Sequence, residues 1–435
     1  MSLCDGVADW RRFGLTPSLL GLRHATEANH MSDKHFRILH TADWHIGKTL
    51  LGLPLLDDQR HVLQQLLAHI EAHRPNVVVI AGDIYDRSVP AADAVQLLDE
   101  TLTAIVQRLQ TPVVLIAGNH DGPERLGFGA ALLGGCGLTV RGPVDLRAAP
   151  VRLDAGGWWV SLCPMPYAEP TTVRAQAGVG EADPAAGGAT VRDHAAALAL
   201  QARHLLDQVP PGDRTVAIAH GFVQGGRVAN NSGDEYSESE RPLAVGGTAV
   251  IDPQAFEGFD YAALGHLHQP QWVAGSRRIR YSGSLLQYSF AEADQPRSAS
   301  LVALSSDGSV DVTELSMVPV RPLRKIEGLL ADLVEQGKRD PHRDDLVWAT
   351  LTDAGVLLDP MGQLRQGYPN ALHIARPQLE GGSGELLRGD HRQRQPIDVL
   401  GDFWVAVHGV PLPDPARVVA APLVDKLIAD ARGAR

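Results

Sequence analysis

The chain has 435 residues, enough for two or three domains at roughly 100–200 residues each, and its 44% hydrophobic and 21% charged residues exclude wholesale disorder. The 39 basic and 51 acidic residues leave a net charge of −12, so a site that binds phosphate must create its positive charge locally. No apolar run is long enough to span a bilayer and the three cysteines form no CxxC pair, so we expect a cytoplasmic protein with neither a disulfide framework nor a structural zinc site.

Residues 1–35 differ from the rest of the chain. Their acidic and basic side chains cancel, and no apolar core follows the arginines, which makes them a poor secretory signal. Met31 stands just before the first strand-like run, at residues 36–40. We expect this segment to be an upstream extension or a disordered tail, with a short ordered arm as the alternative.

From residue 36 the pattern alternates between strand and helix. Continuous apolar runs at residues 76–83 and 112–121 predict strands covered on both faces. Residues 55–73 and 91–109 carry apolar side chains at helical spacing. This alternation predicts an α/β domain with parallel strands.

The following part of the chain is richer in strands. A hairpin is predicted over residues 300–317, turning at Asp307 and Gly308, and a helix near residues 191–208. The polar stretch at residues 224–247 is long for a structureless loop, so we expect it to be functional or mobile. We expect a second sheet packed against the first, so that residues 36–320 form a two-sheet sandwich flanked by helices. Its further strands are predicted at residues 158–166, 215–221, 260–268 and 278–286.

A smaller α+β module is predicted over residues 321–380, where three short strands alternate with one helix and with a turn or short helix. Residues 381–435 read as a linker and a helical tail. A helix at residues 397–407 places Leu400, Phe403, Trp404 and Val407 on one face. A second helix near residues 423–431 is in doubt because the tail is rich in proline.

Metal-ligand residue types stand at the ends of five predicted strands. Carboxylate, amide and imidazole donors without a thiolate suit a divalent cation of intermediate hardness. With 18 histidines in the chain, any single one is as often structural, whereas five such segments in this order leave little room for that interpretation. The segments are Asp43-x-His45, Gly82-Asp83, Gly118-Asn119-His120-Asp121, Ala219-His220-Gly221 and Gly265-His266-Leu267-His268.

This ordered set resembles the calcineurin-like metallophosphoesterases. Within that superfamily, SERPLAVGG, YAALGHLHQPQ, RYSGSLLQYSF and the segments RILHTADWHIGK, AGDIYDRSVP and LIAGNHDGPERL resemble the SbcD family of nuclease subunits. VLLDPMGQLRQGYPNALHIARP extends the resemblance to residue 376. The GNHD and GHLH boxes belong to the whole superfamily, whereas SERPL-x-VGG and YPN-x-L point to SbcD.

The resemblance implies a site for two Mn²⁺ ions, with Mg²⁺ as an alternative. A bridging carboxylate holds two ions about 3.5–4 Å apart, where they clamp the attacking and leaving oxygens of a phosphoryl displacement. Two divalent ions and two aspartates leave a local charge of about +2, which attracts a phosphodiester despite the acidic chain. The implied ligands are Asp43, His45 and His268 for one ion, Asn119, His220 and His266 for the other, and Asp83 as the bridge.

Three further residues are candidates for catalysis. The resemblance places His120 beside the scissile phosphate, where it stabilises the transition state or protonates the leaving oxygen; the alternative is that it braces the loop. Asp121 is expected to orient a histidine. Asp86 stands where archaeal relatives carry a histidine implicated in exonuclease action, and whether it has the same role is open.

The resemblance implies a nuclease of DNA repair, recombination and replication. Its activities are expected to be 3′→5′ exonuclease on duplex DNA and endonuclease on single strands and hairpins. The implied partners are DNA and the SbcC coiled-coil ATPase, in a nucleoid-associated complex that contains two copies of each protein. The chain itself has no GxxxxGK[ST] phosphate loop, which is consistent with ATP being handled by SbcC. The helix at residues 91–109 or the segment after Asp121 is expected to dimerise, and the tail helix to dock on SbcC.

Two other functions compete with this one. The core motifs equally fit a phosphatase or phosphodiesterase for small molecules or phosphoproteins, and a non-catalytic scaffold is disfavoured because it has no need of two sets of ligands. Candidates for contact with the DNA backbone, each also readable as an ordinary surface charge, are Lys48, Arg87, Arg125, Arg277, Arg278 and Arg280.

Overall fold

The computed structural model describes residues 35–178, 191–227, 250–377, 395–408 and 410–433. Our expectations for the N-terminal extension, for residues 228–247 of the polar stretch with its SERPLAVGG segment, and for most of the linker lie outside the described residues.

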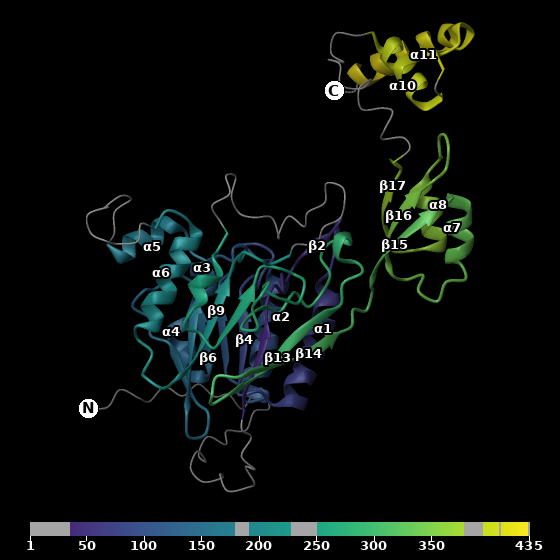
Figure 1. Ribbon diagram of the computed structural model, residues 1–435. Helices are drawn as coiled ribbons and strands as arrows, with labels where there is room; N and C mark the ends of the chain where they lie inside the picture. Colours follow the sequence, from purple (N-terminus) through teal and green to yellow (C-terminus); the bar gives the residue numbers. More distant parts are fainter. Residues whose placement is uncertain (1–34, 179–190, 228–249, 378–394, 409, 434–435) are drawn as a thin grey trace, which may run out of the picture. The chain divides into compact units, whose positions relative to one another are not determined.

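The first of two six-stranded sheets contains the predicted parallel strands (Figure 1). Its strand order is β14-β13-β1-β4-β5-β6, and the predicted hairpin pairs antiparallel to β1 at one side. Gly308, with a φ of 86°, lies in the hairpin turn, as predicted. The strands are β1 (His35–Thr41), β4 (Val77–Ala81), β5 (Val113–Ile116), β6 (Leu138–Arg141), β13 (Arg297–Ser305) and β14 (Val310–Met317).

The second sheet has the order β11-β12-β10-β9-β8-β7, and its four inner strands are parallel. The expected second sheet is therefore present. Its strands are β7 (Val151–Asp154), β8 (Trp159–Met165), β9 (Arg214–His220), β10 (Tyr261–Gly265), β11 (Gln271–Trp272) and β12 (Ile279–Tyr281). A small ribbon of β2 (Thr49–Leu50) and β3 (Leu53–Pro54) precedes the first helix.

Helices cover the outer faces of both sheets. The first predicted helix is α1 (Leu56–His73), and the second, α2 (Ala92–Thr103), continues as a π-helical turn to Arg108. The second sheet is covered by α6 (His194–Leu206). The remaining helical segments of the sandwich are short: α3 (Pro123–Leu126), α4 (Ala130–Leu133), α5 (Pro170–Ala177) and the 3-10 turns at Gly134–Cys136, Pro253–Phe256 and Phe290–Glu292.

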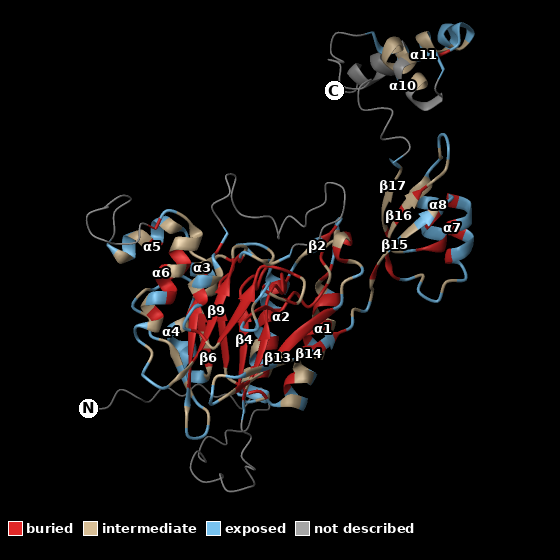
Figure 2. Ribbon diagram, viewed as in Figure 1, coloured by how far each residue is buried: buried red, intermediate tan, exposed pale blue. Residues whose placement is uncertain are grey.

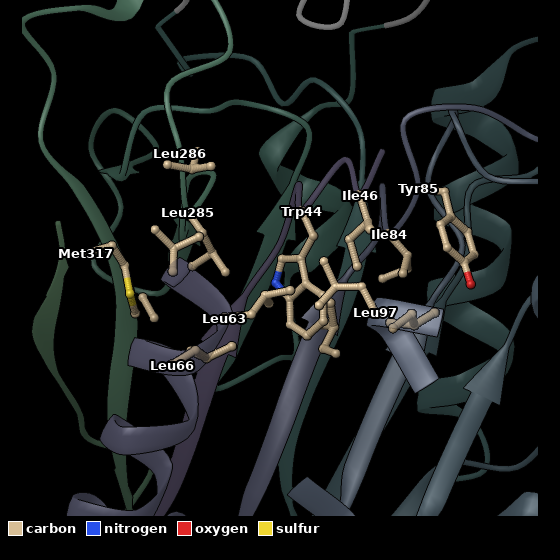
Figure 3. Packing of buried hydrophobic residues seen from close by; sticks show 14 of the residues in the cluster. Trp44, Ile46, Leu63, Leu66, Ile84, Tyr85, Leu97, Leu285, Leu286 and Met317 are labelled. Atoms are coloured by element: carbon tan, nitrogen blue, oxygen red, sulfur yellow. The ribbon is translucent and has the colours of Figure 1, made fainter. Parts of the chain in front are cut away.

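The inner strands β4, β5 and β10 are buried on both faces, as the red colouring of β4 in Figure 2 shows. On β4, Val77 and Val79 face the second sheet, whereas Val78 and Ile80 face α1 and α2. Figure 3 shows part of the outer cluster, in which the buried Trp44 lies near side chains of both helices. This division of a strand between two cores confirms the predicted α-β-β-α layers.

The smaller module is built on three strands in the order β15-β16-β17. Its helices pack on the sheet around a separate buried cluster that contains Leu333, Leu364 and Tyr368. All the strand pairs are parallel. The α+β arrangement that we expected did not specify the direction of the strands. The elements are β15 (Leu323–Gly328), α7 (Leu330–Gly337), β16 (Leu346–Leu351), α8 (Pro360–Gly367) and β17 (Ala371–Ala375).

The tail consists of two helices, α10 (Pro396–His408) and α11 (Asp414–Gly433). The second is longer than the predicted 423–431 and contains Pro422 in its interior. Of the apolar face expected on α10, the side chain of Val407 lies outside the described residues. In the described part of the chain, no helix combines the length and the apolar character needed to cross a membrane.

A buried histidine links the two sheets. His40 on β1 is fully buried and lies with Nδ1 2.9 Å from the hydroxyl of Tyr261 and with Nε2 3.1 Å from the carbonyl of Leu264, both on β10. Because a carbonyl only accepts, Nε2 donates to it, and in the neutral imidazole Nδ1 then accepts from the tyrosine. Burial, with a smaller effect from Arg280, lowers the pKa of His40 to about 3.

We predict that His40→Gln weakens the dependence of stability on acid. Because the folded pKa lies below the unfolded value of about 6.5, the unfolded chain binds more protons between these values, and stability falls as the pH falls. Between pH 7 and pH 5 this group accounts for a loss of about 2 kcal/mol. Urea unfolding in EDTA at both pH values measures the difference. The half-buried His204→Gln on α6 is the control, and an unchanged slope in His40→Gln would contradict the prediction.

Candidate metal centre

The predicted ligand residues converge at the carboxyl ends of strands from both sheets. Carboxyl ends of parallel strands are where α/β folds present ligand sites. Each of these residues lies where the regular pairing of its strand ends, so a short loop sets the direction of its side chain. Asp43 and His45 follow β1, Asp83 follows β4, Asn119 follows β5, His220 ends β9, and His266 and His268 follow β10.

The loops after β1 and β4 are held together by main-chain hydrogen bonds. The N–H of Asp43 donates to Gly82 and that of His45 donates to Asp83, both at 3.0 Å. Asp43, His45 and Asp83 have left-handed φ values of 53°, 43° and 49°, and His266 has 110°. Such conformations cost of order 1–3 kcal/mol each and are typical of functional sites.

Close approach at the centre of the site requires glycine at position 118. A Cβ on Gly118 would lie 2.2 Å from Oδ1 of Asp83 and 2.3 Å from its main-chain nitrogen. Both atoms belong to a buried and tightly bonded residue that has no room to move. The glycine before Asn119 therefore allows the β5 loop to reach Asp83.

Asp43, His45 and His268 form the first group of potential ligands, which we call the first trio. All three are fully buried, and each offers a ligand atom within 4.8 Å of the others. The Nε2 atoms of the two histidines lie 3.2 Å apart. The carboxylate of Asp43 is fixed by the N–H of His266, which lies 2.9 and 3.0 Å from its two oxygens.

Asn119, His220 and His266 form the second trio. Oδ1 of Asn119 lies 2.9 Å from Nε2 of His220 and 3.3 Å from Nδ1 of His266. Oδ2 of Asp83 lies 3.4 Å from Nε2 of His220 and 3.6 Å from Nε2 of His45. Asp83 therefore stands between the two trios.

The electrostatics of the site favour neutral His45 and His266, and a charged pair of His220 and Asp83. Burial opposes the charge of His220, but Asp83 outweighs burial and raises the pKa of His220 to about 9. Burial lowers the pKa of His45 to about 4 and that of His266 to about 3. Burial by itself favours the neutral acid at Asp83, but His220 and His45 outweigh it and hold the pKa of Asp83 well below its ordinary value. Burial raises the pKa of Asp43 to about 6.

The donor set fits divalent cations. Oδ2 of Asp83, which lies between the two trios, is buried without a hydrogen-bond partner. Nδ1 of His220 lies 2.8 Å from the carbonyl of Ala81, which only accepts, so this nitrogen carries a proton and Nε2 is the atom that faces Asn119 and Asp83. A buried carboxylate oxygen without a donor is costly in an empty site and becomes a ligand when a cation binds.

His120 and Asp86 lie beside the first trio. The ring centroid of His120 lies 4.8 Å from that of His45, and its Nδ1 lies 2.9 Å from the carbonyl of Asp86. Burial opposes the charge of Asp86, but His45 and Lys48, whose Nζ lies 2.8 Å away, hold the pKa of Asp86 far below its ordinary value. Asp86 is therefore an ionised acceptor and not a proton donor.

The expectation that Asp121 orients a histidine is wrong. Its carboxylate instead accepts the main-chain N–H groups of Ile84, Tyr85 and Gly118, at 3.1, 2.9 and 2.9 Å. It therefore joins the loops after β4 and β5. Loop N–H groups that have left the sheet need acceptors, and a buried carboxylate supplies several at once.

Among the six candidate DNA contacts, Arg280 is excluded. It is only 3% exposed, because it lies on the buried β12, bonds Ser300 and Glu314, and stacks on Trp272. Lys48 is half-buried against Asp86. Exposed side chains remain at Arg87, Arg125, Arg277 and Arg278.

Sequence reasoning missed the residues that support the ligands. Gln59 on α1 accepts the N–H of Gly47 and donates to the carbonyl of His45, which fixes the loop after β1. The hydroxyl of Tyr288 donates to the carbonyl of Trp44. Glu292 lies 3.0 Å from Nδ1 of His268. Each of these residues contacts a loop that is distant in the sequence, so local patterns do not reveal its role. Only Tyr288 lies in a segment, RYSGSLLQYSF, that the sequence analysis singled out.

Comparison with known proteins identifies two matching regions. Residues 36–270 match the calcineurin-like phosphoesterases, and residues 319–408 match a family described as the type 5 capsule protein repressor C-terminal domain. The SbcD protein of the SbcCD nuclease from Staphylococcus epidermidis is 33% identical over 339 residues, which are 78% of this chain and 85% of that protein.

Two solved structures are similar at a much lower level. TT1561 of Thermus thermophilus has a TM-score of 0.34 and 10% identity, over 64% of this chain and 99% of that one. GAP50 of Plasmodium has a TM-score of 0.32 and 11% identity, over 79% of this chain and 97% of that one. Likenesses of this size carry no information about function.

We predict that Gly118→Ala displaces Asp83 and weakens the binding of divalent cations. The added Cβ must force apart two buried loops, at a cost of about 1–3 kcal/mol in the free energy of unfolding. Thermal unfolding in EDTA and in Mn²⁺ measures the stability and the gain on binding. Gly134→Ala is the matched control, because a Cβ there meets nothing within 4 Å. An unchanged Mn²⁺-dependent gain in Gly118→Ala would contradict the prediction.

Proposed function

Since the chain belongs to the SbcD family of calcineurin-like phosphoesterases, we propose that it is the metal-dependent nuclease component of a DNA-processing complex, with 3′→5′ exonuclease activity on duplexes and endonuclease activity on single strands and hairpins. The observation that carries the proposal is the meeting of two histidine-containing trios on either side of Asp83. A hydrolase of phosphoester bonds follows from the family, and the DNA substrate is the step that we add.

We assign one ion to Asp43, His45 and His268, and the other to Asn119, His220 and His266, with Asp83 as the shared ligand. We propose Mn²⁺, with Mg²⁺ as an alternative. When bound, two such ions polarise the phosphodiester and supply a nucleophile from water near neutral pH. Oδ2 of Asp83, buried between the two trios without a hydrogen-bond partner, supports this assignment.

The protein groups around the ions have separate tasks. Asp83 and the trios hold their positions through main-chain bonds and do not need to reorganise during the reaction. His120 contacts the phosphate and supplies a hydrogen bond or a proton to the leaving oxygen, because its Nδ1 is held by the Asp86 carbonyl and Nε2 is left for the substrate. Asp121 keeps the loop that carries His120 in place.

Partners and boundaries are also proposed. We assign the nuclease domain to residues 36–320, the capping domain to residues 321–380, and a partner-binding tail to residues 381–435. The SbcC ATPase is the proposed partner of the tail, where Phe403 on α10 is exposed.

The cytoplasm, in association with the nucleoid, is the proposed location. Arg87 and Arg125 are exposed and follow the β4 and β5 loops, so they are the proposed contacts to the DNA backbone.

A homodimer is proposed through the segment after Asp121. Phe128, between α3 and α4, is 86% exposed, and Leu132 on α4 is 82% exposed. Large apolar side chains gathered in one short segment favour contact with a second protein surface. Because this segment continues from the His120 loop, a dimer formed there places the two candidate sites at fixed positions on one DNA molecule.

We predict that the purified chain shortens end-labelled duplex DNA in the presence of Mn²⁺ and does not do so in EDTA. The assay compares Mn²⁺ with Mg²⁺, and each condition is measured with and without SbcC. His120→Ala lowers the rate by about 10²–10⁴-fold without loss of bound metal, because it removes only the group that acts on the leaving oxygen. Asp83→Asn abolishes cleavage, because the shared ligand loses its charge.

His204→Ala is the control for this assay, since its ring bonds the Leu200 carbonyl within its own helix. If no DNA is cleaved under any of these conditions while small phosphate esters are hydrolysed, the protein is a phosphatase or phosphodiesterase.

We predict that the double substitution Phe128→Asp and Leu132→Asp converts the dimer to a monomer without lowering stability, because these side chains are exposed and the added charges repel across the interface. Light scattering after size exclusion measures the mass. Val356→Asp with Leu358→Asp is the matched control, since these side chains are 64% and 85% exposed in the smaller module. A persistent dimer, or equal dissociation in the control, would refute this interface.

A further inference from the structure

A buried chain of charged groups lies behind the first trio. Oε1 of Glu292 is 3.0 Å from Nδ1 of His268, and Oε2 of the same carboxylate accepts a hydrogen bond from the guanidinium of Arg297. Glu292 and His268 are fully buried, and Arg297 is 3% exposed. Removing two charged groups from water is costly, so the presence of this buried pair needs a reason beyond packing.

The local sequence holds Glu292 in one place. The 3-10 turn Phe290–Glu292 begins after Ser289, whose hydroxyl accepts the N–H of Ala291 at 3.1 Å. The main-chain N–H of Tyr288 donates to Oε2 of Glu292 at 3.0 Å. Both carboxylate oxygens therefore have donors, and the side chain has no freedom to turn away from His268.

His268 is held at both of its ends. Arg297 donates one hydrogen bond to the main-chain carbonyl of His268 and another to the carboxylate that contacts its ring. The guanidinium of Arg297 and the N–H of Tyr288 both donate to this carboxylate, which is the pattern of an ionised acceptor. The carboxylate therefore only accepts, so Nδ1 of His268 carries a proton and Nε2 presents its lone pair toward His45.

The partner of His268 differs from those of the neighbouring imidazoles. His220 and His120 direct Nδ1 at main-chain carbonyls, and Nδ1 of His45 is 3.6 Å from the carboxylate of Asp86, beyond hydrogen-bond distance. An ionised acceptor withdraws the Nδ1 proton more strongly than a carbonyl does and makes Nε2 a better electron donor. The first trio is thus built differently from the second.

We propose that Glu292, supported by Arg297, is a positioning residue that fixes the orientation and raises the basicity of His268, and so strengthens cation binding by Asp43, His45 and His268. This inference rests on the proposed function, because it takes the first trio to be a metal site. Loss of such a carboxylate behind a histidine ligand lowers metal affinity by about 10–100-fold in proteins.

The test is a calorimetric titration of the full-length chain with Mn²⁺, with bound ions counted by electron paramagnetic resonance. Glu292→Gln keeps the shape and an oxygen that accepts from His268, and removes the charge. We expect two binding events in the unmodified chain. In the variant we expect one of them to weaken about 10–100-fold while the other is retained. In the His220→Ala background, which removes an imidazole of the second trio, Glu292→Gln weakens the remaining event by the same factor.

Asp213→Asn is the matched control. Asp213 also pairs with an arginine, Arg152, and accepts a hydrogen bond from Ser161, but it lies at the start of β9, at the opposite end of the strand from His220. We expect this variant to lose stability in EDTA without a change in either binding event. Equal effects of the two substitutions on Mn²⁺ binding would overturn the proposal, as would unchanged affinities in Glu292→Gln or an equal weakening of both events.

A folding defect is separated from a binding defect by a second variant. If Glu292→Gln leaves Arg297 unpaired and unfolds the chain in EDTA, the pair Glu292→Gln with Arg297→Met removes both charges together. The same selective weakening is expected, and its absence refutes the role of the carboxylate. If the unmodified chain binds no divalent cation, the proposed metal centre fails together with this inference, whereas two intact events in the variants overturn the inference alone.

Discussion

The buried carboxylate of Asp83 is the contact on which the rest of this structure depends. It leaves the first sheet at the end of β4 and reaches His220 at the end of β9 in the second sheet. A charge in this position is tolerated only if the surrounding loops supply donors and the opposite sheet supplies imidazoles. The close approach at Gly118, the left-handed loop residues and the bonds between the β1 and β4 loops all follow from that requirement.

The residues that contact the ligands from behind also depend on completed hydrogen bonds. Asp121 gathers three loop N–H groups, Gln59 fixes the loop after β1, and Glu292 fixes His268. Each of these polar side chains is buried and bonds at least one group from another loop. The precision of the site is thus a property of the loops and of their packing, and the two sheets supply the frame from which the loops emerge.

Much of the frame was predictable because apolar periodicity is local. The alternating strands and helices, the hairpin at Gly308 and the two-sheet sandwich follow from residues close together in sequence. The residues of the two trios were predictable as a group because they directly follow strand ends. The role of Asp121 was not, since choosing between an imidazole and loop amides depends on loop geometry. Arg280 looked like a surface charge, yet its strand is buried and its partner Glu314 is on the other sheet. Glu292 acts on a histidine 24 residues away, through a turn that no periodicity marks.

The left-handed backbone at Asp43, His45 and Asp83 links metal supply to the lifetime of the protein. Without a cation, the strained loops and unpartnered donors lower the stability of the folded state. A ligand present at a thousand times its dissociation constant raises the free energy of unfolding by about 4.1 kcal/mol, which is comparable to the strain energy of the loops. We therefore expect chains that lose their ions to open more often and to be degraded first, which would enrich the surviving population in molecules ready to act.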